Sequence, residues 1–387
     1  NYTTQTKKTE QFADVIRKKI GLPVTFYDER LTSALNEVLG YMHMGSCTEL
    51  EVEWAEMVKK LVPCAKDGLV RACACGGEAI EIAVRLARIY TGKDKVVIHE
   101  NCYHGKWETI NVGHSGPPYG QCNIKGIPES VRRLVKIIPY NHPDALKNAL
   151  EEGDVACVIL QGNAPYTKEY MEDVRELTAY YGVAFILDEV VSGFRYAPGG
   201  AQEYYGVIPD IAVLGKIVGG GAPIGAICGK EEIMKFHIFK EKDDYWNRFV
   251  RICVGGTWNA QPLSIRAGLE AMKIIDKERD EIYPRLYKIC DELTKSLEDS
   301  SEEFSLKIKA KGVPPERPMV SICPEFNGNF KELAQYVYYL TLSNNGVHPF
   351  GRYRFIPCCK HSDEDLKRTR EAIRQAFKNL KEGKIVQ

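Results

Sequence analysis

Two residues of opposite charge each follow a strongly apolar run of the sequence. Asp188 comes directly after VAFIL (183–187), and Lys216 comes directly after IAVLG (211–215). If both runs are parallel strands of one sheet, their carboxyl ends lie at the same edge, and so do the two side chains. A carboxylate and an ammonium there could form an ordinary ion pair, because buried charges are normally paired.

A bound cofactor is the alternative to this ion pair. Pyridoxal phosphate needs a lysine amine for its Schiff base and an acid group that keeps its pyridinium nitrogen protonated. A lysine in an apolar site loses its proton more readily, because burial disfavours the charged form, and an imine-forming nucleophile requires this. Lys216 and Asp188 are therefore candidate catalytic residues.

Two upstream motifs could bind the other parts of such a cofactor. CACGGEA places Gly76 and Gly77 immediately before a predicted helix, where backbone N–H groups can approach a phosphate and the helix dipole favours negative charge. NCYHGKW offers Tyr103 for stacking on a flat ring, with His104 beside it. A Tyr-His pair in a loop also serves ordinary packing.

The elements around these motifs indicate an α/β fold. Apolar runs of strand length alternate with segments of helical period from about residue 70 to 230, which predicts a mostly parallel sheet. The predicted strands are 95–99, 156–160, 183–191, 211–215 and 224–229, and the predicted helices are 78–90 and 168–181. Thr48 and Glu51 form a capping-box pattern before a further helix at 48–61.

The alternation of strand and helix patterns ends at about residue 270. Charged helical segments are followed by a proline-rich link (311–318) and a final helix that starts near SDEDL, which predicts a smaller α+β domain.

Composition narrows the class of protein. The 387 residues suffice for two domains, and equal numbers of basic and acidic residues (52 each) provide no field to attract nucleic acid or an anionic membrane. The 13 cysteines show no zinc-binding spacing, so we expect no metal site and reduced thiols in a cytoplasm. No apolar run approaches the roughly 20 residues that a membrane helix needs.

The order of the motifs resembles a known family. The glycine turn, the aromatic loop, LDEVVSGFR, GVIPDIAVLGKIVGGGAPIGAICG and GGTWNAQPLSIRAGLEAM follow one another as in the class III (subgroup II) aminotransferases. TELEVEWAEMVKKLVP and RLARIYTGKDKVV also resemble that family, closely over about residues 45–275. GIPESVRRLVKIIPYN (126–141) and the tail GVHPF to HSDEDL are most similar to glutamate-1-semialdehyde aminomutases.

The resemblance implies a fold type I pyridoxal-phosphate enzyme, with an aspartate-aminotransferase-like fold. Its large domain would have a mostly parallel central sheet, and its carboxyl-terminal domain would be a smaller α+β unit. We expect an N-terminal segment (1–47) that packs on the small domain, a cofactor-binding domain (48–272) and a small domain (273–387).

The resemblance also assigns roles to residues around the cofactor ring. It makes Lys216 the Schiff-base lysine and proton shuttle, and it pairs Asp188 with the pyridinium nitrogen. Val190 would pack under the ring, while Tyr103 would stack on the opposite face with His104 next to it.

A second set of residues would hold the phosphate of the cofactor. Cys75, Gly76 and Gly77 form the expected phosphate turn, and Thr257 would reach it from a second subunit. This implies a homodimer with active sites shared between subunits.

The chain departs from the family at several points. The phosphate turn usually reads SGTEA, so that Cys75 and Gly77 replace two hydroxyl residues. After the strand ACVIL, Gln161 stands where a glutamate is common, and the loop is shorter. The β-rich N-terminal segment of the aminomutases is missing or replaced. FGRYRFIP carries Arg352 and Arg354, either of which could clamp a substrate carboxylate.

We therefore expect an aminotransferase that moves an amino group from an amino acid donor to a carbonyl substrate through Lys216. An intramolecular 2,1-aminomutase or an amino acid racemase on the same scaffold is the alternative, since all three share these catalytic residues. A non-catalytic relative would be expected to lack Lys216, which this chain retains.

Overall fold

The computed structural model describes residues 48–112, 125–311, 322–328, 330–351 and 353–385. These residues fall into two compact units, one up to Arg279 and one from Asp280 onward. The expected N-terminal segment, 1–47, lies outside the described residues.

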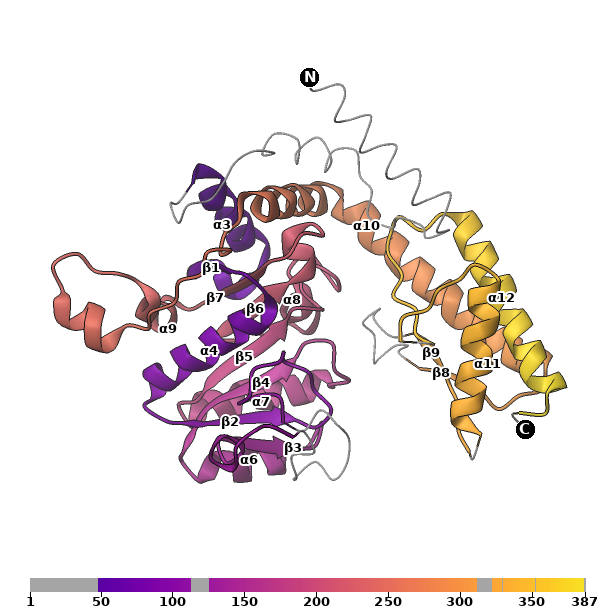
Figure 1. Ribbon diagram of the computed structural model, residues 1–387, viewed down its shortest axis with the longest axis horizontal. Helices are drawn as coiled ribbons and strands as arrows, with labels where there is room; N and C mark the ends of the chain where they lie inside the picture. Colours follow the sequence, from indigo (N-terminus) through magenta and orange to yellow (C-terminus); the bar gives the residue numbers. More distant parts are fainter. Residues whose placement is uncertain (1–47, 113–124, 312–321, 329, 352, 386–387) are drawn as a thin grey trace, which may run out of the picture. The chain divides into compact units, whose positions relative to one another are not determined.

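The first unit contains a sheet of seven strands in the order β1-β7-β6-β5-β4-β2-β3 (Figure 1). Strands β6, β5, β4, β2 and β3 are parallel neighbours, and β7 runs antiparallel between β6 and β1. The strands are β1 (Leu69–Cys73), β2 (Lys95–His99), β3 (Val135–Ile138), β4 (Val155–Gln161), β5 (Ala184–Glu189), β6 (Ile211–Gly215) and β7 (Gly225–Gly229). The predicted α/β fold with a mostly parallel sheet is confirmed.

The central strands are buried on both faces, which explains their continuous apolar sequences. Alternate residues such as Cys157 and Ile159 of β4 form one core with helix α4 (Gly76–Thr91). The intervening residues, such as Val158 and Leu160, face the other side and are equally buried.

The other helices of this unit lie before, between and after the strands. They are α3 (Glu49–Leu61), η1 (Pro63–Ala65), α5 (Glu129–Arg132), α6 (Pro143–Glu151), α7 (Lys168–Tyr180), α8 (Gly200–Tyr205), η2 (Lys216–Gly219), α9 (Glu231–Met234), η3 (Lys235–His237) and η4 (Trp246–Val250). The side chain of Thr48 caps α3 as its sequence predicted, by accepting a hydrogen bond from the N–H of Glu51.

Helix α10 (Pro262–Glu303) runs from the first unit into the second, and its backbone leaves helical geometry at Glu278. The second unit also contains β8 (Lys309–Lys311), β9 (Cys323–Glu325), α11 (Lys331–Asn344) and α12 (Asp363–Glu382). Its core is apolar and separate from that of the first unit.

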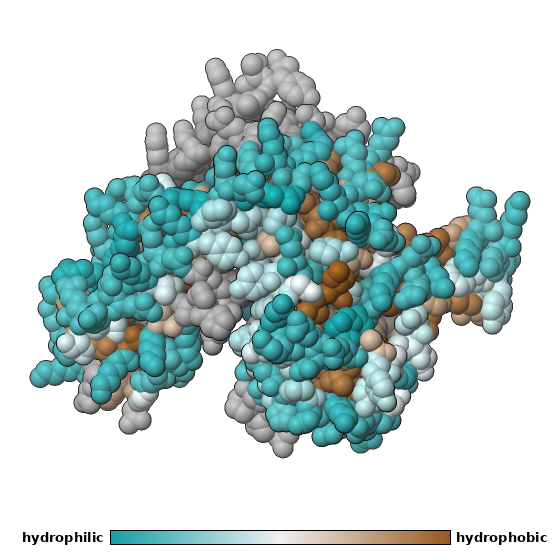
Figure 2. Space-filling view, turned by 180° about the vertical axis from the view of Figure 1, so that it is seen from behind, coloured by the Kyte–Doolittle hydropathy of each residue, from teal (hydrophilic) through white to brown (hydrophobic). Residues whose placement is uncertain are grey.

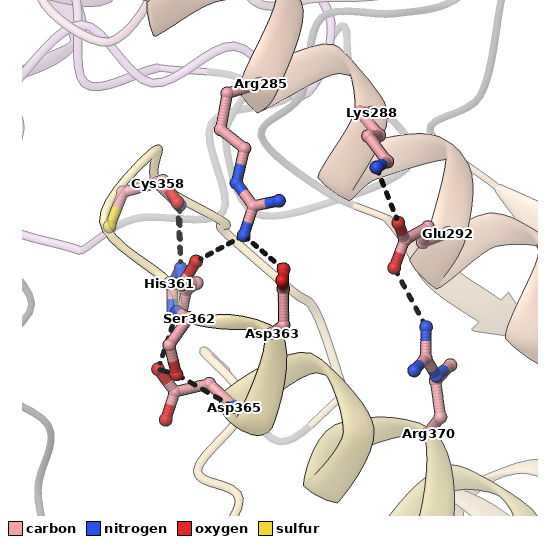
Figure 3. Close-up of polar contacts among 9 residues, drawn as sticks. All are labelled: Arg285, Lys288, Glu292, Cys358, His361, Ser362, Asp363, Asp365 and Arg370. Carbon is pink, nitrogen blue, oxygen red and sulfur yellow. Dashed lines mark hydrogen bonds and ion pairs between the residues drawn. The ribbon is translucent and has the colours of Figure 1, made fainter.

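Ion pairs join α10 to α12 within the second unit (Figure 3). Arg285 donates to Asp363 at 2.8 Å, and Arg370 donates to Glu292 at 2.9 Å. Ser362 caps α12 in a reciprocal capping box. These contacts join the two helices at their surface, beside the apolar core that both share.

Candidate active site

The parallel strands bring the predicted residues to one edge of the sheet. Gln161 is the last residue of β4 and lies beside Asp188 of β5, and Lys216 follows the last residue of β6. Because neighbouring parallel strands end at the same edge, the three side chains belong to one site.

Lys216 has an unusual backbone conformation. Its φ is +51°, in the left-handed region that residues other than glycine seldom adopt. Strain of this kind is found mainly at functional sites, where the surrounding structure maintains it. The side chain is exposed in the single chain, yet desolvation lowers the pKa of its amine, against an opposing effect of the Asp188 charge.

Asp188 is buried, and its partner is a histidine. One carboxylate oxygen, Oδ2, lies 2.8 Å from Nδ1 of His104, and the other accepts a hydrogen bond from the N–H of Val190 at 3.0 Å. Within the described part of the chain no ion pair joins Lys216 to a carboxylate. The expected alternative of an Asp188–Lys216 ion pair is therefore replaced by an Asp188–His104 pair.

The charge of Asp188 changes the state of His104. Burial alone would lower the pKa of this imidazole, but the hydrogen bond and the charge of Asp188, together with Cys102, raise it to about 9. His104 is thus an imidazolium at neutral pH. Among the described residues its Nε2 has no hydrogen-bond partner.

Val190 lies in a tight cradle of glycine backbone. A Cβ on Gly76 would lie 2.7 Å from a methyl carbon of Val190, and one on Gly215 would lie 3.0 Å from another. Any larger residue at these positions would push Val190 out of place. The nearest atoms to a Cβ on Gly77 are 3.9 Å away, so the space beside the start of α4 is open.

The start of α4 leaves backbone donors for an anion. Cys75 is its N-cap residue and makes no side-chain capping bond to the described residues. The first-turn N–H groups are therefore available to a phosphate, as the glycine turn predicted. Cys75 itself is exposed.

Two residues that the sequence did not single out tie this turn to the segment around Thr257. The carboxylate of Glu78 accepts hydrogen bonds from the N–H of Ala74 at 2.7 Å and from Nδ2 of Asn259 at 3.2 Å. Thr257 lies two residues before Asn259 and is exposed. A glutamate three residues after an N-cap is the signal that identifies Glu78.

Tyr103 is held through its backbone. Its N–H donates to Oε1 of Gln161 at 2.8 Å, while Nε2 of Gln161 donates to Asn163 at 2.9 Å. Tyr103 is 45% exposed, so its ring is accessible to a ligand. Gln161, predicted as a substrate contact, thus also positions Tyr103.

A buried carboxylate organises the loop after Asp188. Glu189 is fully buried and accepts hydrogen bonds from the hydroxyl of Ser192 and from the backbone N–H groups of Ala201 and Gln202. Its pKa is raised because desolvation outweighs these donors. The signal for Glu189 was its place beside Asp188 inside an apolar run.

The roles of the two candidate substrate arginines stay predictions. Arg352 lies outside the described residues. Arg354 belongs to the second unit, where it is exposed and its guanidinium lies 5.5 Å from the ring centre of Tyr353.

The described residues contain no cluster of His, Cys, Asp or Glu that could hold a metal ion. Over the same residues, no helix is both long and apolar enough to cross a membrane.

Comparisons with known proteins identify the family of the chain. The model of the aminotransferase class-III family matches residues 9–377. A glutamate-1-semialdehyde 2,1-aminomutase of Methanococcus maripaludis is 34% identical, over 89% of this chain and 83% of its own. An omega-transaminase from Sphaerobacter thermophilus has a TM-score of 0.79 at 25% identity, over 91% of this chain and 83% of that one. A structure titled transaminase with PLP bound has a TM-score of 0.80 at 23% identity, over 92% and 84%.

The chain therefore belongs to the class-III aminotransferase family, whose members are pyridoxal-phosphate enzymes. Its residues fit that cofactor. The glycine cradle leaves room at the start of α4 for a phosphate, and a buried carboxylate and an amine of lowered pKa lie at the same sheet edge.

Proposed function

We propose that this protein binds pyridoxal 5′-phosphate and transfers an amino group from an amino acid donor to a carbonyl acceptor. The observation that carries the proposal is the separation of charges at the sheet edge. Asp188 is engaged by His104, which leaves the amine of Lys216 with a lowered pKa and outside any ion pair of the described residues.

Bound pyridoxal phosphate supplies an aldehyde that joins to amines and a ring that accepts the electrons released at the substrate carbon. The chain supplies the rest. Lys216 holds the cofactor and moves the proton between the substrate carbon and the cofactor, for which a neutral amine is needed. Asp188, with His104 behind it, provides the negative charge that keeps the ring nitrogen protonated.

The remaining residues of the site would hold the cofactor in place. The backbone around Cys75, Gly76 and Gly77 binds the phosphate in this proposal, Val190 supports one face of the ring and Tyr103 covers the other. The support is the open space at the start of α4 and the exposed ring of Tyr103.

An intramolecular aminomutase is the second candidate. The favouring observation is the 34% identity to a glutamate-1-semialdehyde 2,1-aminomutase over 83% of its length. We place transamination first because FGRYRFIP (350–357) differs from the corresponding stretch of the aminomutases, which carries an acidic residue.

We also propose a homodimer in which Thr257 contributes to the phosphate site of the second subunit. Residues 235–258, which include Thr257, form an arm that extends from the sheet (Figure 1). Apolar side chains lie along this arm in the space-filling view (Figure 2). Its exposed large hydrophobic residues are Ile238, Phe239, Tyr245, Phe249 and Trp258, of which Phe249 is 74% exposed.

A second subunit that covered the arm would remove this apolar surface from water. Thr257, near the end of the arm, would then lie against that subunit. We expect the protein to work in a reducing compartment such as the cytoplasm, since no disulfide joins the eleven cysteines within the described residues.

The test begins with purified protein and pyridoxal phosphate. The expected result is a visible absorption band that an amino donor such as glutamate bleaches, with about one oxo acid released per site in a half-reaction. Lys216→Ala should lower turnover by about three orders of magnitude or more. Lys230→Ala, which removes an ion pair to Asp210, is the matched control and should keep its turnover.

The outcomes separate the candidates. An amino-aldehyde converted without consumption of a donor would favour the aminomutase. Turnover in Lys216→Ala at the wild-type level would contradict both.

A further inference from the structure

A buried cluster lies behind the cofactor site and is not used by the proposed chemistry. It consists of His99, Cys102, Tyr140, Tyr166 and Tyr170, which we call the tyrosine cage. These residues follow the carboxyl ends of three adjacent strands, β2, β3 and β4. The cage therefore lies at the same sheet edge as the site, and its Cys102 directly precedes Tyr103 and His104 in the chain.

Ring contacts make the cage compact. The ring of His99 stacks on Tyr140 at a centroid distance of 5.9 Å and meets Tyr166 and Tyr170 edge-on at 5.1 and 5.5 Å. Tyr166 also contacts Tyr140 and Tyr170 at 5.6 and 5.8 Å. Four of the five side chains are at most 3% exposed, so the cage is a packed element rather than a pocket.

Polar contacts inside the cage involve its hydroxyl groups and the thiol. The Tyr170 hydroxyl lies 2.6 Å from Nε2 of His99. The sulfur of Cys102 lies 3.7 Å from the Tyr140 hydroxyl and 3.6 Å from that of Tyr166. Cys102 thus connects two strand-end loops to the segment that carries the cofactor-facing residues.

The cage is electrically neutral beside a charged pair. Burial lowers the pKa of His99 to about 3, an effect to which the charge of His104 adds. Burial also raises the pKa of the Tyr166 and Tyr170 hydroxyls. The charged group paired with His104 is Asp188 on β5, whose charge also acts on the amine of Lys216 after β6.

Hydrogen bonds of Asn141 join the two loops that carry Tyr140 and Tyr166. Asn141 donates from Nδ2 to the carbonyl of Pro165 at 2.9 Å and accepts the N–H of Thr167 at 3.0 Å. The loops that carry Tyr140 and Tyr166 are thereby fixed to each other without the cofactor.

We propose that the tyrosine cage is a positioning group that holds His104 against Asp188 and Tyr103 over the cofactor, with Cys102 as its link to them. This inference rests on the proposed cofactor site. A preformed cage spares the cofactor the cost of ordering these residues when it binds. Its residues are positioning residues, since none of them is placed against substrate or cofactor.

The test uses full-length protein with Tyr166→Phe and Cys102→Ala, which remove a hydroxyl or a thiol and keep the packing nearly intact. Matched controls are Tyr338→Phe and Cys290→Ala, a buried phenol and a buried thiol of the second unit. Two quantities are measured: the dissociation constant of pyridoxal phosphate, and the visible circular dichroism per bound cofactor, which reports the orientation of its ring.

Both cage variants should raise the dissociation constant by about three- to tenfold, the effect of one hydrogen bond, and change the circular dichroism. Both controls should leave the two quantities at wild-type values. Cage variants with a lowered Tm but unchanged affinity and dichroism would overturn the inference, because a purely structural role predicts that result.

If Tyr166→Phe does not fold, Tyr140→Phe is used instead. It removes the other hydroxyl that contacts the Cys102 sulfur, at a partly exposed position, and should change the dissociation constant and the circular dichroism in the same way. Wild-type protein that binds no pyridoxal phosphate would refute the proposed function itself. A result that refutes only the role of the tyrosine cage is therefore distinguishable from one that refutes the proposed cofactor site.

Discussion

The Asp188–His104 pair should make the stability of the first unit depend on pH in a defined direction. The pKa of His104 is about 9 in the folded chain and about 6.5 in an unfolded chain. The folded chain therefore keeps a proton that the unfolded chain releases. The stabilisation is fully present below about pH 6.5 and is lost as the pH rises through about 9.

The size of this effect follows from the same two values. At about 1.4 kcal/mol for each pH unit, the difference between about 9 and 6.5 corresponds to about 3 kcal/mol. His104 is 2% exposed, so solvent screens the pair little. This is about a fifth to three fifths of the 5–15 kcal/mol that is typical of a folded domain.

The perturbation is Asp188→Asn, which keeps an acceptor near His104 and removes the charge. Burial then lowers the pKa of His104, so the variant loses stability as the pH falls below about 6.5 instead. His99 and His237 have lowered pKa values of about 3 and about 4 in the wild type, and their contributions largely cancel in the difference between the two proteins.

The assay is urea unfolding of cofactor-free protein at about pH 6 and about pH 9.5, followed by tryptophan fluorescence. All four tryptophans lie between residues 54 and 258, so the signal reports the first unit. The wild type should exceed the variant by about 3 kcal/mol more at the lower pH. A difference that stayed constant, or grew with pH, would refute the pairing.

Two further predictions concern the cofactor site. Cys75 should react readily with a thiol reagent in cofactor-free protein and at least about tenfold more slowly with pyridoxal phosphate bound, whereas Cys253, also exposed, should react equally in both; equal protection of both thiols, or of neither, would contradict the phosphate turn. Gln161→Leu removes the acceptor for the Tyr103 N–H and should weaken cofactor binding by about tenfold, while Gln161→Glu keeps an acceptor and should bind within about threefold of wild type, as titrated by absorbance; equal losses in the two variants would count against this role.

The sequence was sufficient to place the central strands and the residues at their ends. The run IAVLG coincides with β6, and the end of VAFIL places Asp188 in β5. Buried parallel strands need apolar residues on both faces, so their sequences are distinctive. A charged residue that ends such a run is then visible without a structure.

The edge strands were not predicted, for a physical reason. β1 contains Arg71 and β3 contains Lys136, and both strands have partly exposed residues. A strand at the edge of a sheet is covered less completely, so it carries a mixed sequence that resembles a loop. The partner of Asp188 was also not predictable, because His104 is 84 positions from Asp188 and the sheet order alone brings them together.

The choice of partner for Asp188 determines what Lys216 can do. Had the two charges formed an ion pair, the carboxylate would have raised the pKa of the amine and held it as an ammonium. With His104 at 2.8 Å, the carboxylate is already paired, and desolvation becomes the larger effect on Lys216. The same imidazolium keeps Asp188 oriented toward the ring nitrogen that it would serve. One histidine thus separates a base from an acid at a single sheet edge, and this separation is what amino-group transfer requires of the protein.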